Sequence, residues 1–338
     1  MYDFTVVVME GAYPTSVAVT LDILAAAAAL APRARVSKPR WRVCSVDGAN
    51  VTLQGGVSVA TSKLPARPRN DRSTWVLPGL GVAQGSAIGE RLARPDAIQV
   101  AAAIARHARA GGQVAASCSA VFLLQGAGVL RGRCATTSWW LAPMLKRTSP
   151  DHTVDADRMV CVDGPIVTAG AAFAQTDLML RLLREHFGSV LVDAVSRMLL
   201  IDGRQAQTPF VVPEVLANGD DLVARLTARI ESSLPKSPTV AELAEECCMS
   251  ERTLSRHLQR VTGRSTMALI HSVKLRRAKT LLESSRMTVE RVAEAVGYQD
   301  STALRRMMKR VAGANPSRYR PSVVVAAKGR AGAGGIGA

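Results

Sequence analysis

The sequence has no apolar run of the roughly 18 residues that a membrane-spanning helix requires. The alanine-rich stretch at 25–31 is short and follows Asp22, so we predict a buried helix there. The N-terminus has an acid, Asp3, where a secretory leader has lysine or arginine, and no small-residue cleavage site follows. We therefore expect a cytoplasmic protein without a membrane partner.

Paired cysteines and clustered histidines are also missing. The six cysteines, at positions 44, 118, 134, 161, 247 and 248, form no C-x-x-C pair, and the five histidines complete no zinc-binding pattern. We predict reduced and mostly buried thiols, and neither a metal nor a cofactor. His107, His152 and His186 match no motif, so we expect them on the surface.

Acidic residues are outnumbered by basic ones. The 338 residues include 43 Lys and Arg against 27 Asp and Glu, which gives a net charge of +16. Residues 219–322 hold 19 basic against 11 acidic side chains, whereas residues 1–218 hold 22 against 16. A basic chain of this kind favours a polyanionic partner such as nucleic acid.

The length is enough for two domains, each with its own core. Residues 1–202 alternate strand-like and helix-like segments, which predicts a flavodoxin-like α/β sandwich with a mostly parallel sheet. Residues 203–219 contain two prolines and two glycines without periodicity and are predicted to be a linker. Residues 220–322 are predicted to be all-helical, and the Gly/Ala-rich residues 323–338 a disordered tail.

The helical region contains an internal repeat, at 239–263 and 288–313, with a connecting helix predicted at 266–284. Apolar residues recur at helical spacing in both copies: Val240, Leu243, Ala244 and Cys247, then Val289, Val292, Ala293 and Val296. Each copy is therefore predicted to be a helix, a tight turn and a second helix, and Thr288 to be an N-cap. Gly297 suits the second turn. Because Cys248 occupies the matching place, we expect the first turn to be made differently.

Two helix-turn-helix units on a rigid connector can place two recognition helices about 34 Å apart, in successive segments of the major groove. The outward positions of the second helices are rich in arginine and contain Glu251 as their one acid, unlike the mixed surface of an ordinary helical bundle. Arginine binds guanine bidentately, and the other side chains suit phosphates or base edges. These outward residues are Arg252, Ser255, Arg256, Gln259, Thr302, Arg305, Arg306 and Lys309.

Residues 274–320 resemble the signature of the AraC/XylS family of bacterial transcription regulators. The matching residues are Leu275, Ala278, Leu281, Leu282, Ala293, Gly297, Tyr298, Gly313, Pro316, Tyr319 and Arg320, and Leu304 and Met308 replace two core phenylalanines of the family. The resemblance implies double-stranded DNA as partner. It assigns base contacts in one groove segment to Arg252, Ser255 and Arg256, and in the next to Thr302, Ala303 and Arg306.

A different chemistry is suggested by Cys118. A predicted strand at 113–117 leads into the small residues A-S-C-S-A and then a helix, which is the steric requirement of a nucleophile elbow. A helix N-terminus lowers the pKa of a thiol, and the Pro-Gly-Leu-Gly segment at 78–81 could supply backbone donors opposite it. A small buried hydrophobic side chain is the alternative interpretation.

The segments CSAVFLLQGAGVLRGRCATTSWW, TAGAAFAQTDLMLRLLREHFG and RQAQTPF resemble the PfpI and class I glutamine amidotransferase-like superfamily. The nearest pattern is the subset fused to an AraC domain, the GlxA-type regulators. Two histidine positions of these patterns are occupied by Ser138 and Ser119, and an acidic position falls near Ser16. A cysteine without a base or an orienting acid is a poor catalytic set, so we expect no enzyme and a vestigial elbow at Cys118.

We expect the first domain to bind a small ligand, to dimerise, or both. A pocket is predicted where strand C-termini meet helix N-termini, at Gly79, Leu80, Cys118, Ser138 and Gly170. The resemblance implies an amino acid, amine or betaine as effector, a homodimer through the N-terminal domain, and RNA polymerase as a partner.

The prediction is thus a ligand-responsive activator in the bacterial cytoplasm, at the nucleoid when bound. One alternative is a cysteine-dependent amidase or deglycase with a DNA-binding module, and another is a ligand-independent DNA binder whose first domain only dimerises.

Overall fold

The computed structural model describes residues 2–65, 71–82, 84–148, 151–201, 221–262, 264–312 and 315–319, together with Arg204 and Gln207. The predicted linker, apart from those two residues, and the predicted tail lie outside the described residues, as do Gly313 and Arg320. The domain boundaries placed there stay predictions.

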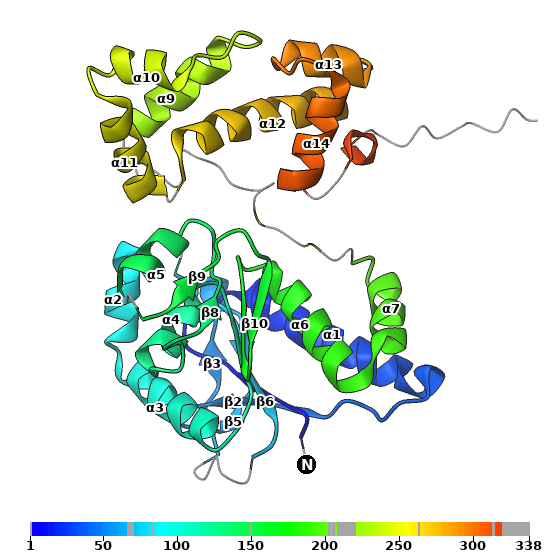
Figure 1. The fold of residues 1–338 in the computed structure, drawn as a ribbon. Coiled ribbons are helices and arrows are strands. Elements are labelled where there is room, and N and C mark those ends of the chain that lie inside the picture. The colour runs from blue at the N-terminus through cyan, green and yellow to red at the C-terminus, as the bar shows by residue number, and fades with distance from the viewer. Residues whose placement is uncertain are drawn as a thin grey trace, which may run out of the picture.

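An α/β domain forms the N-terminal part of the chain (Figure 1). Its main sheet has the strand order β10-β11-β7-β6-β1-β2-β5, and all neighbours are parallel except the hairpin β10–β11. The run β2-β1-β6-β7-β11 has the flavodoxin-like order, so the predicted fold class is confirmed. The strands are β1 (Phe4–Val7), β2 (Trp41–Ser45), β3 (Val51–Thr52), β4 (Ser58–Val59), β5 (Ser62–Lys63), β6 (Thr74–Leu77), β7 (Val114–Ser117), β8 (Cys134–Ala135), β9 (Thr153–Val154), β10 (Val160–Asp163) and β11 (Ile166–Ala169).

Helices cover both faces of this sheet. On one face lie α1 (Pro14–Ala34), α6 (Ala174–Phe187) and α7 (Ser189–Met198); on the other lie α2 (Ser86–Leu92), α3 (Pro95–Arg109), α4 (Val121–Gly126) and α5 (Ala142–Thr148). Successive strand residues point to opposite faces, so Val6 and Val76 join the core under α1 and α6 while Val7 and Trp75 join the other. The sandwich therefore has two apolar layers.

The sequence analysis did not identify α2, α5 or α7, which have seven to ten residues and, unlike the short first helices of the C-terminal repeat, no second copy that reveals their period. The prediction that His107 lies on the surface is wrong. This side chain is fully buried, and its ring stacks on Trp75 with 4.5 Å between centroids. The imidazole packs there as an aromatic side chain.

By length and composition, α1 is the one helix among the described residues that could cross a membrane. In the structure Ile23, Leu24 and Ala27 on α1 are fully buried in the domain core, and the helix packs against α6 and α7. The predicted buried helix at 25–31 is therefore confirmed.

The described residues after 220 form helices: α9 (Asp221–Ser232), α10 (Val240–Glu246), α11 (Glu251–Thr262), α12 (Thr266–Ser284), α13 (Val289–Ala295), α14 (Ser301–Ala312) and a 3-10 turn at Pro316–Tyr319. Helices α10–α11 and α13–α14 are the two predicted helix-turn-helix pairs. Thr288 caps α13 by accepting the N–H of Arg291 at 3.2 Å, as predicted. Thr239 caps α10 in the same way and forms a full capping box with Glu242.

One helix, α12, supplies part of the core of both pairs. Leu269, Ile270 and Val273 pack with α9, α10 and α11. Leu275, Ala278 and Leu282, one turn and more further along, pack with α13 and α14. The two pairs are thus built on opposite ends of the same rod.

The two tight turns have the same geometry. Gly297 has φ +75°, and Cys248 has φ +54°, in the left-handed region that an L side chain rarely adopts. The N–H groups of Cys248 and Gly297 bond the carbonyls of Glu245 and Glu294, at 2.9 and 3.0 Å. The expectation that the first turn is made differently is therefore wrong, and Cys248 adopts the strained conformation instead.

We expect Cys248→Gly to raise the stability of the helical region by about 1 kcal/mol, because glycine adopts positive φ without strain. Gly297→Ala should lower it by more, since an added Cβ would lie 2.0 Å from the Pro235 carbonyl oxygen. Urea denaturation followed by helical circular dichroism measures both. Cys247→Gly is the matched control: the φ of Cys247 is −96°, so this change should destabilise. A Cys248→Gly variant that is less stable than wild type would contradict the conclusion that the backbone at Cys248 is strained.

Candidate nucleic-acid interface and cysteine site

The second helix of each pair carries the residues predicted to contact DNA. Arg252, Arg256 and Gln259 on α11 and Thr302, Arg305 and Arg306 on α14 are exposed, as is Lys309, whereas Ser255 and Ala303 are half-buried. Leu254 and Leu258 on α11 and Leu304 and Met308 on α14 are buried in the two cores. Arg256 and Arg306 each follow the first of these core residues by two positions, so they occupy equivalent places on the two helices.

Three of the predicted contact residues are engaged within the protein. The hydroxyl of Ser255 lies 3.1 Å from that of Thr266 on α12. The guanidinium of Arg305 lies 3.6 Å from a carboxylate oxygen of Glu290 on α13, and Gln259 lines a pocket shared with the N-terminal domain. Arg252, Arg256 and Arg306 are exposed on this face, whereas Arg305 pairs with α13 and Ser255 is positioned against the connecting helix.

The cysteine site lies at the carboxyl end of β7. Cys118 follows this strand directly with φ +55°, and a short 3-10 turn leads from it into α4. This strained strand-to-helix turn is the backbone geometry of a nucleophile elbow. Cys118 thus has the backbone geometry that such an elbow requires, and its role as a vestigial elbow stays a prediction.

The five residues of the predicted ligand pocket come together here and are all buried. The N–H of Cys118 donates to the Gly170 carbonyl at 2.7 Å, and the Ser138 hydroxyl donates to the Cys118 sulfur at 3.0 Å. The N–H of Leu80 donates to the Ser119 hydroxyl at 3.0 Å, and a Cβ on Gly79 would lie 3.2 Å from that of Cys118. The side chains of Cys118 and Ser138 are 0% exposed, so the cluster is closed.

The electrostatics of Cys118 differ from the expectation for a helix N-terminus. Complete burial raises the pKa of its thiol above the ordinary value, and the hydrogen bonds from Ser138 and Ser119 only partly offset this. The helix-terminal effect is thus outweighed by desolvation. Ser16, at the position where related enzymes have an acid, is buried and donates to the Ala172 carbonyl at 3.2 Å.

Two residues of this region escaped the sequence analysis. The pKa of Tyr13 is raised, by burial first and by Cys118 second, which places its ring beside the thiol. The side-chain amide of Gln207 lies over Gly170, where a Cβ would be 2.4 Å from it. Gln207 belongs to the RQAQTPF segment that carried the family resemblance, and that segment could have identified it.

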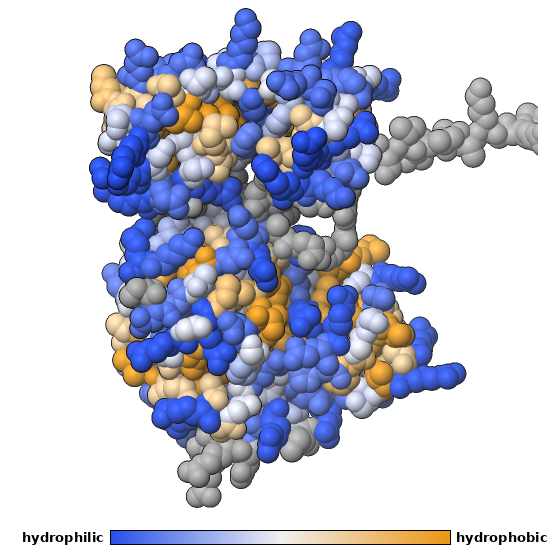
Figure 2. Space-filling view, viewed as in Figure 1, coloured by the Kyte–Doolittle hydropathy of each residue, from blue (hydrophilic) through white to orange (hydrophobic). Residues whose placement is uncertain are grey.

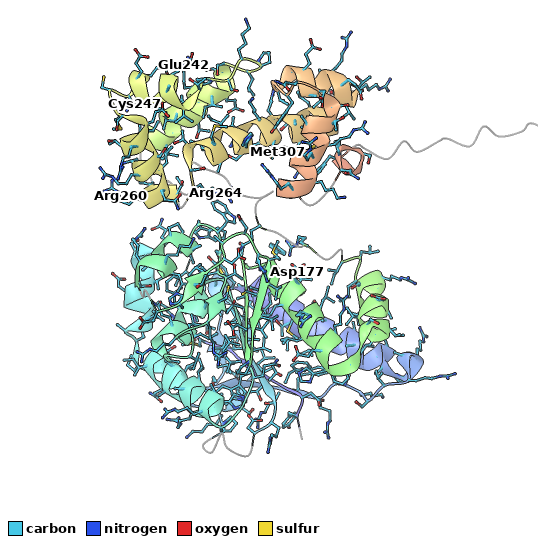
Figure 3. The ribbon with its side chains drawn as sticks, viewed as in Figure 1. Asp177, Glu242, Cys247, Arg260, Arg264 and Met307 are labelled. Atoms are coloured by element: carbon cyan, nitrogen blue, oxygen red, sulfur yellow. The ribbon has the colours of Figure 1, made fainter. Side chains whose placement is uncertain are left out.

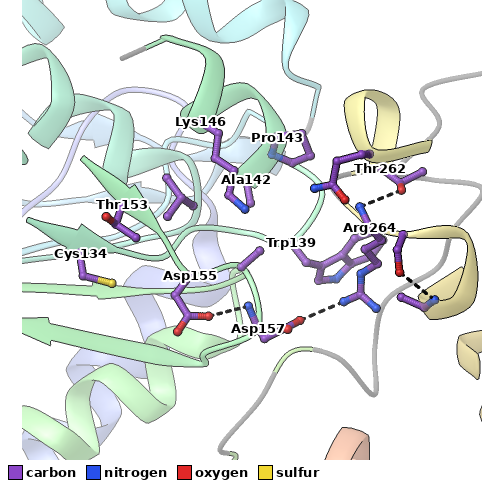
Figure 4. Close-up of a pocket in the computed structure, with 15 residues that line it drawn as sticks. Cys134, Trp139, Ala142, Pro143, Lys146, Thr153, Asp155, Asp157, Thr262 and Arg264 are labelled. Carbon is purple, nitrogen blue, oxygen red and sulfur yellow. Dashed lines mark hydrogen bonds and ion pairs between the residues drawn. The ribbon is translucent and has the colours of Figure 1, made fainter. Parts of the chain in front are cut away.

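Within the described ranges, no three His, Cys, Asp or Glu side chains gather closely enough to hold a metal ion. Two surface hollows lie elsewhere. One, of about 580 Å³, lies between α5, β9 and the region where α11 leads into α12 (Figure 4).

Comparison with known proteins identifies the family of each part of the chain. A model of the DJ-1/PfpI family matches residues 9–185, and a helix-turn-helix domain model matches residues 243–322. The chain belongs to the DJ-1/PfpI family and carries an AraC-type helix-turn-helix domain after it. Both resemblances drawn from the sequence are confirmed.

The similar proteins include transcription regulators that align with most of the chain. The HTH-type transcriptional regulator GlxA of Rhizobium meliloti is 25% identical over 81% of this chain and 82% of that protein. The regulator GbdR of Pseudomonas aeruginosa is 26% identical over 77% of this chain and 68% of that protein. A crystal structure of an AraC family transcriptional regulator from Pseudomonas putida matches 59% of this chain and all of that one, with a TM-score of 0.49 and 21% identity.

We expect Cys118 to resist alkylation by iodoacetamide at neutral pH, because the thiol is buried and its pKa is raised, so that thiolate forms only at higher pH. The exposed thiol of Cys248 should react under the same conditions and serves as the internal control. Mass-spectrometric mapping of the modified peptides measures both. Alkylation of Cys118 at the rate of Cys248 would show an accessible thiolate and contradict this description.

Proposed function

We propose that this protein is a sequence-specific, DNA-binding transcription regulator whose N-terminal domain senses a small metabolite. The observation that carries the proposal is the pair of equivalent recognition helices, α11 and α14, on one connecting helix. Their exposed arginines suit guanine in the major groove. The relatives named as HTH-type transcriptional regulators support the same function.

We propose that the N-terminal domain binds its effector without chemistry. The N–H groups of Leu80 and Cys118, which an oxyanion would need, already donate to protein oxygens. Ser138, and not a histidine, bonds the thiol, and a serine hydroxyl is too weak a base to activate it.

The alternative, a cysteine-dependent amidase or deglycase, is favoured by one observation, the positive φ of Cys118. The alkylation experiment separates the two functions, because such an enzyme needs an accessible thiolate.

The position of the predicted ligand site agrees with the topology. The strand order reverses between β1 and β6, and ligands of open α/β sheets bind outside the carboxyl ends of the strands at such a switch point. Gly79 and Leu80 follow β6 directly. We therefore propose the neighbourhood of Gly79, Leu80, Cys118, Ser138 and Gly170 as the effector site, with an amino acid, amine or betaine as the class of effector.

A homodimer through the N-terminal domain is supported by exposed apolar side chains on and beside α6 and α7 (Figure 2). Val190, Met198 and Leu200 are 67%, 58% and 93% exposed, and Phe173 is 61% exposed. Exposed apolar surface of this kind marks contact sites. The proposed assembly is an activator that acts with RNA polymerase on DNA in the bacterial cytoplasm.

We expect Arg256→Ala and Arg306→Ala each to relax base preference at one position of the DNA site, with a loss of roughly 1–3 kcal/mol for the preferred base. Selection of bound duplexes from a random pool, by wild type and by each variant, measures this. Arg109→Ala, at an exposed arginine on α3, removes the same charge from the other domain and should leave the preference unchanged. Identical selected sequences from all four proteins would contradict the assigned recognition helices.

We expect Val190→Arg to shift the protein from dimer to monomer in light scattering, because it places a charge in the proposed apolar contact. Val57→Arg, at a similarly exposed valine away from α7, should leave the mass unchanged. A dimer that survives Val190→Arg, or a wild type that is a monomer, would contradict this contact.

A further inference from the structure

The end of the recognition helix α11 lies against the N-terminal domain. Arg264, which links α11 to α12, donates from its guanidinium to the carboxylate of Asp157 at 3.1 Å (Figure 4). Figure 3 shows Arg264 at the edge of the helical region that faces the α/β domain. The Arg264 side chain is only 19% exposed, although it carries a full charge.

Other residues of α11, α12 and the N-terminal domain also take part in the contact between the helical region and the α/β domain. Helix α11 packs on α5 of the N-terminal domain. The pocket of about 580 Å³ between them is lined from the helical side by Gln259, Thr262, Arg264, Ser265 and Ala268, and from the α/β side by residues that include Trp139, Ala142, Pro143 and Lys146. Gln259 is thus both a predicted DNA contact and part of the contact between the two parts of the chain.

The orientation of the helices bears on DNA access. Both α11 and α14 lie on the side of α12 that faces the α/β domain, whereas α10 and α13 lie on the far side (Figure 1). A helix-turn-helix unit inserts its second helix into the major groove. A duplex must therefore approach from the side on which the α/β domain lies.

We infer that α5 and residues 153–157 of the N-terminal domain form an intramolecular docking surface for the end of α11, and that this surface competes with DNA for the recognition helix. The inference rests on the proposed DNA-binding function and adds its regulation. In the docked state the protein is closed to DNA, and separation of the two parts opens it.

The contact between the end of α11 and the N-terminal domain has the properties of a reversible interaction. Asp157 is 67% exposed, so its ion pair with Arg264 is partly screened by water and contributes little by itself. A pocket of about 580 Å³ lies between the two parts, so their side chains do not fill the space there. Because both partners belong to one chain, however, their effective concentration is high, and a weak contact is enough to keep most molecules closed.

Gln207 connects this surface to the cysteine site. Its backbone N–H donates to the Asp157 carbonyl at 2.8 Å, and its side-chain N–H groups donate to the carbonyls of Ala156 and Arg158 at 3.3 and 3.0 Å. The same amide lies over Gly170, whose carbonyl accepts from Cys118. A ligand that displaces Gln207 from Gly170 would move the segment that holds Asp157 and release α11.

The test compares three full-length proteins: wild type, Asp157→Arg and Asp22→Arg. Asp157→Arg places a repelling charge beside Arg264. Asp22→Arg makes the same charge change at an exposed position of α1, outside the proposed dimer contact. The probe is a labelled mixed-sequence duplex of about 30 base pairs at low salt, where phosphate contacts dominate binding.

We expect the dissociation constant of Asp157→Arg to be roughly three- to tenfold lower than that of Asp22→Arg, because the apparent affinity of wild type is reduced by the small fraction of open molecules. Equal affinities for the two variants would overturn the inference while leaving the proposed function intact. Absence of binding by all three proteins would overturn the proposed function and, with it, this inference.

Small-angle scattering gives a readout that does not involve DNA. Asp157→Arg should have a larger radius of gyration than wild type, and the charge-swapped double variant Asp157→Arg/Arg264→Asp should return to the wild-type value. An unchanged radius in Asp157→Arg would overturn the docking surface. Expansion that the charge swap does not reverse would overturn the role of the ion pair.

Discussion

The shared helix α12 is the constraint on which the helical region depends. Each helix-turn-helix pair completes its core with one end of α12. A straight helix of 19 residues is about 28 Å long, a length of the same order as one turn of DNA. In the proposed function, the arginines of α11 and α14 form a single DNA-reading surface because α12 fixes their spacing.

Much of this organisation could be predicted from the sequence, because it follows from local rules. The 3.6-residue period of the two copies located the helices, and the alternation in residues 1–202 indicated the parallel sheet. The short helices α2, α5 and α7 were beyond such rules, as was the buried position of His107 against Trp75. At Cys248 the sequence indicated a different kind of turn, but packing of the helix pair imposes a φ of +54°, which a side chain disfavours. Tertiary structure outweighs local preference at these positions.

The sequence predicted more about the cysteine site than about the contact between the helical region and the α/β domain. The elbow at Cys118 was predictable from the small residues around it, but the direction of its pKa shift was not, because burial depends on packing from β6, β11 and the segment around Ser138. The contact between Asp157 and Arg264 joins residues 107 positions apart and has no local signal. Such a contact is visible only once both parts of the chain are folded. In the regulation that we infer, Gln207 connects the closed cysteine site to the docking surface that holds Asp157.

The most direct test of this account is the spacing of the DNA contacts. Hydroxyl-radical footprinting on duplexes selected from a random pool shows which segments the bound protein protects. If α12 sets the separation of the two recognition helices, the footprint contains two protected segments on one face of the duplex, with centres about 10–10.5 base pairs apart in every selected site. A single protected segment, or two whose spacing varies from site to site, would contradict the account.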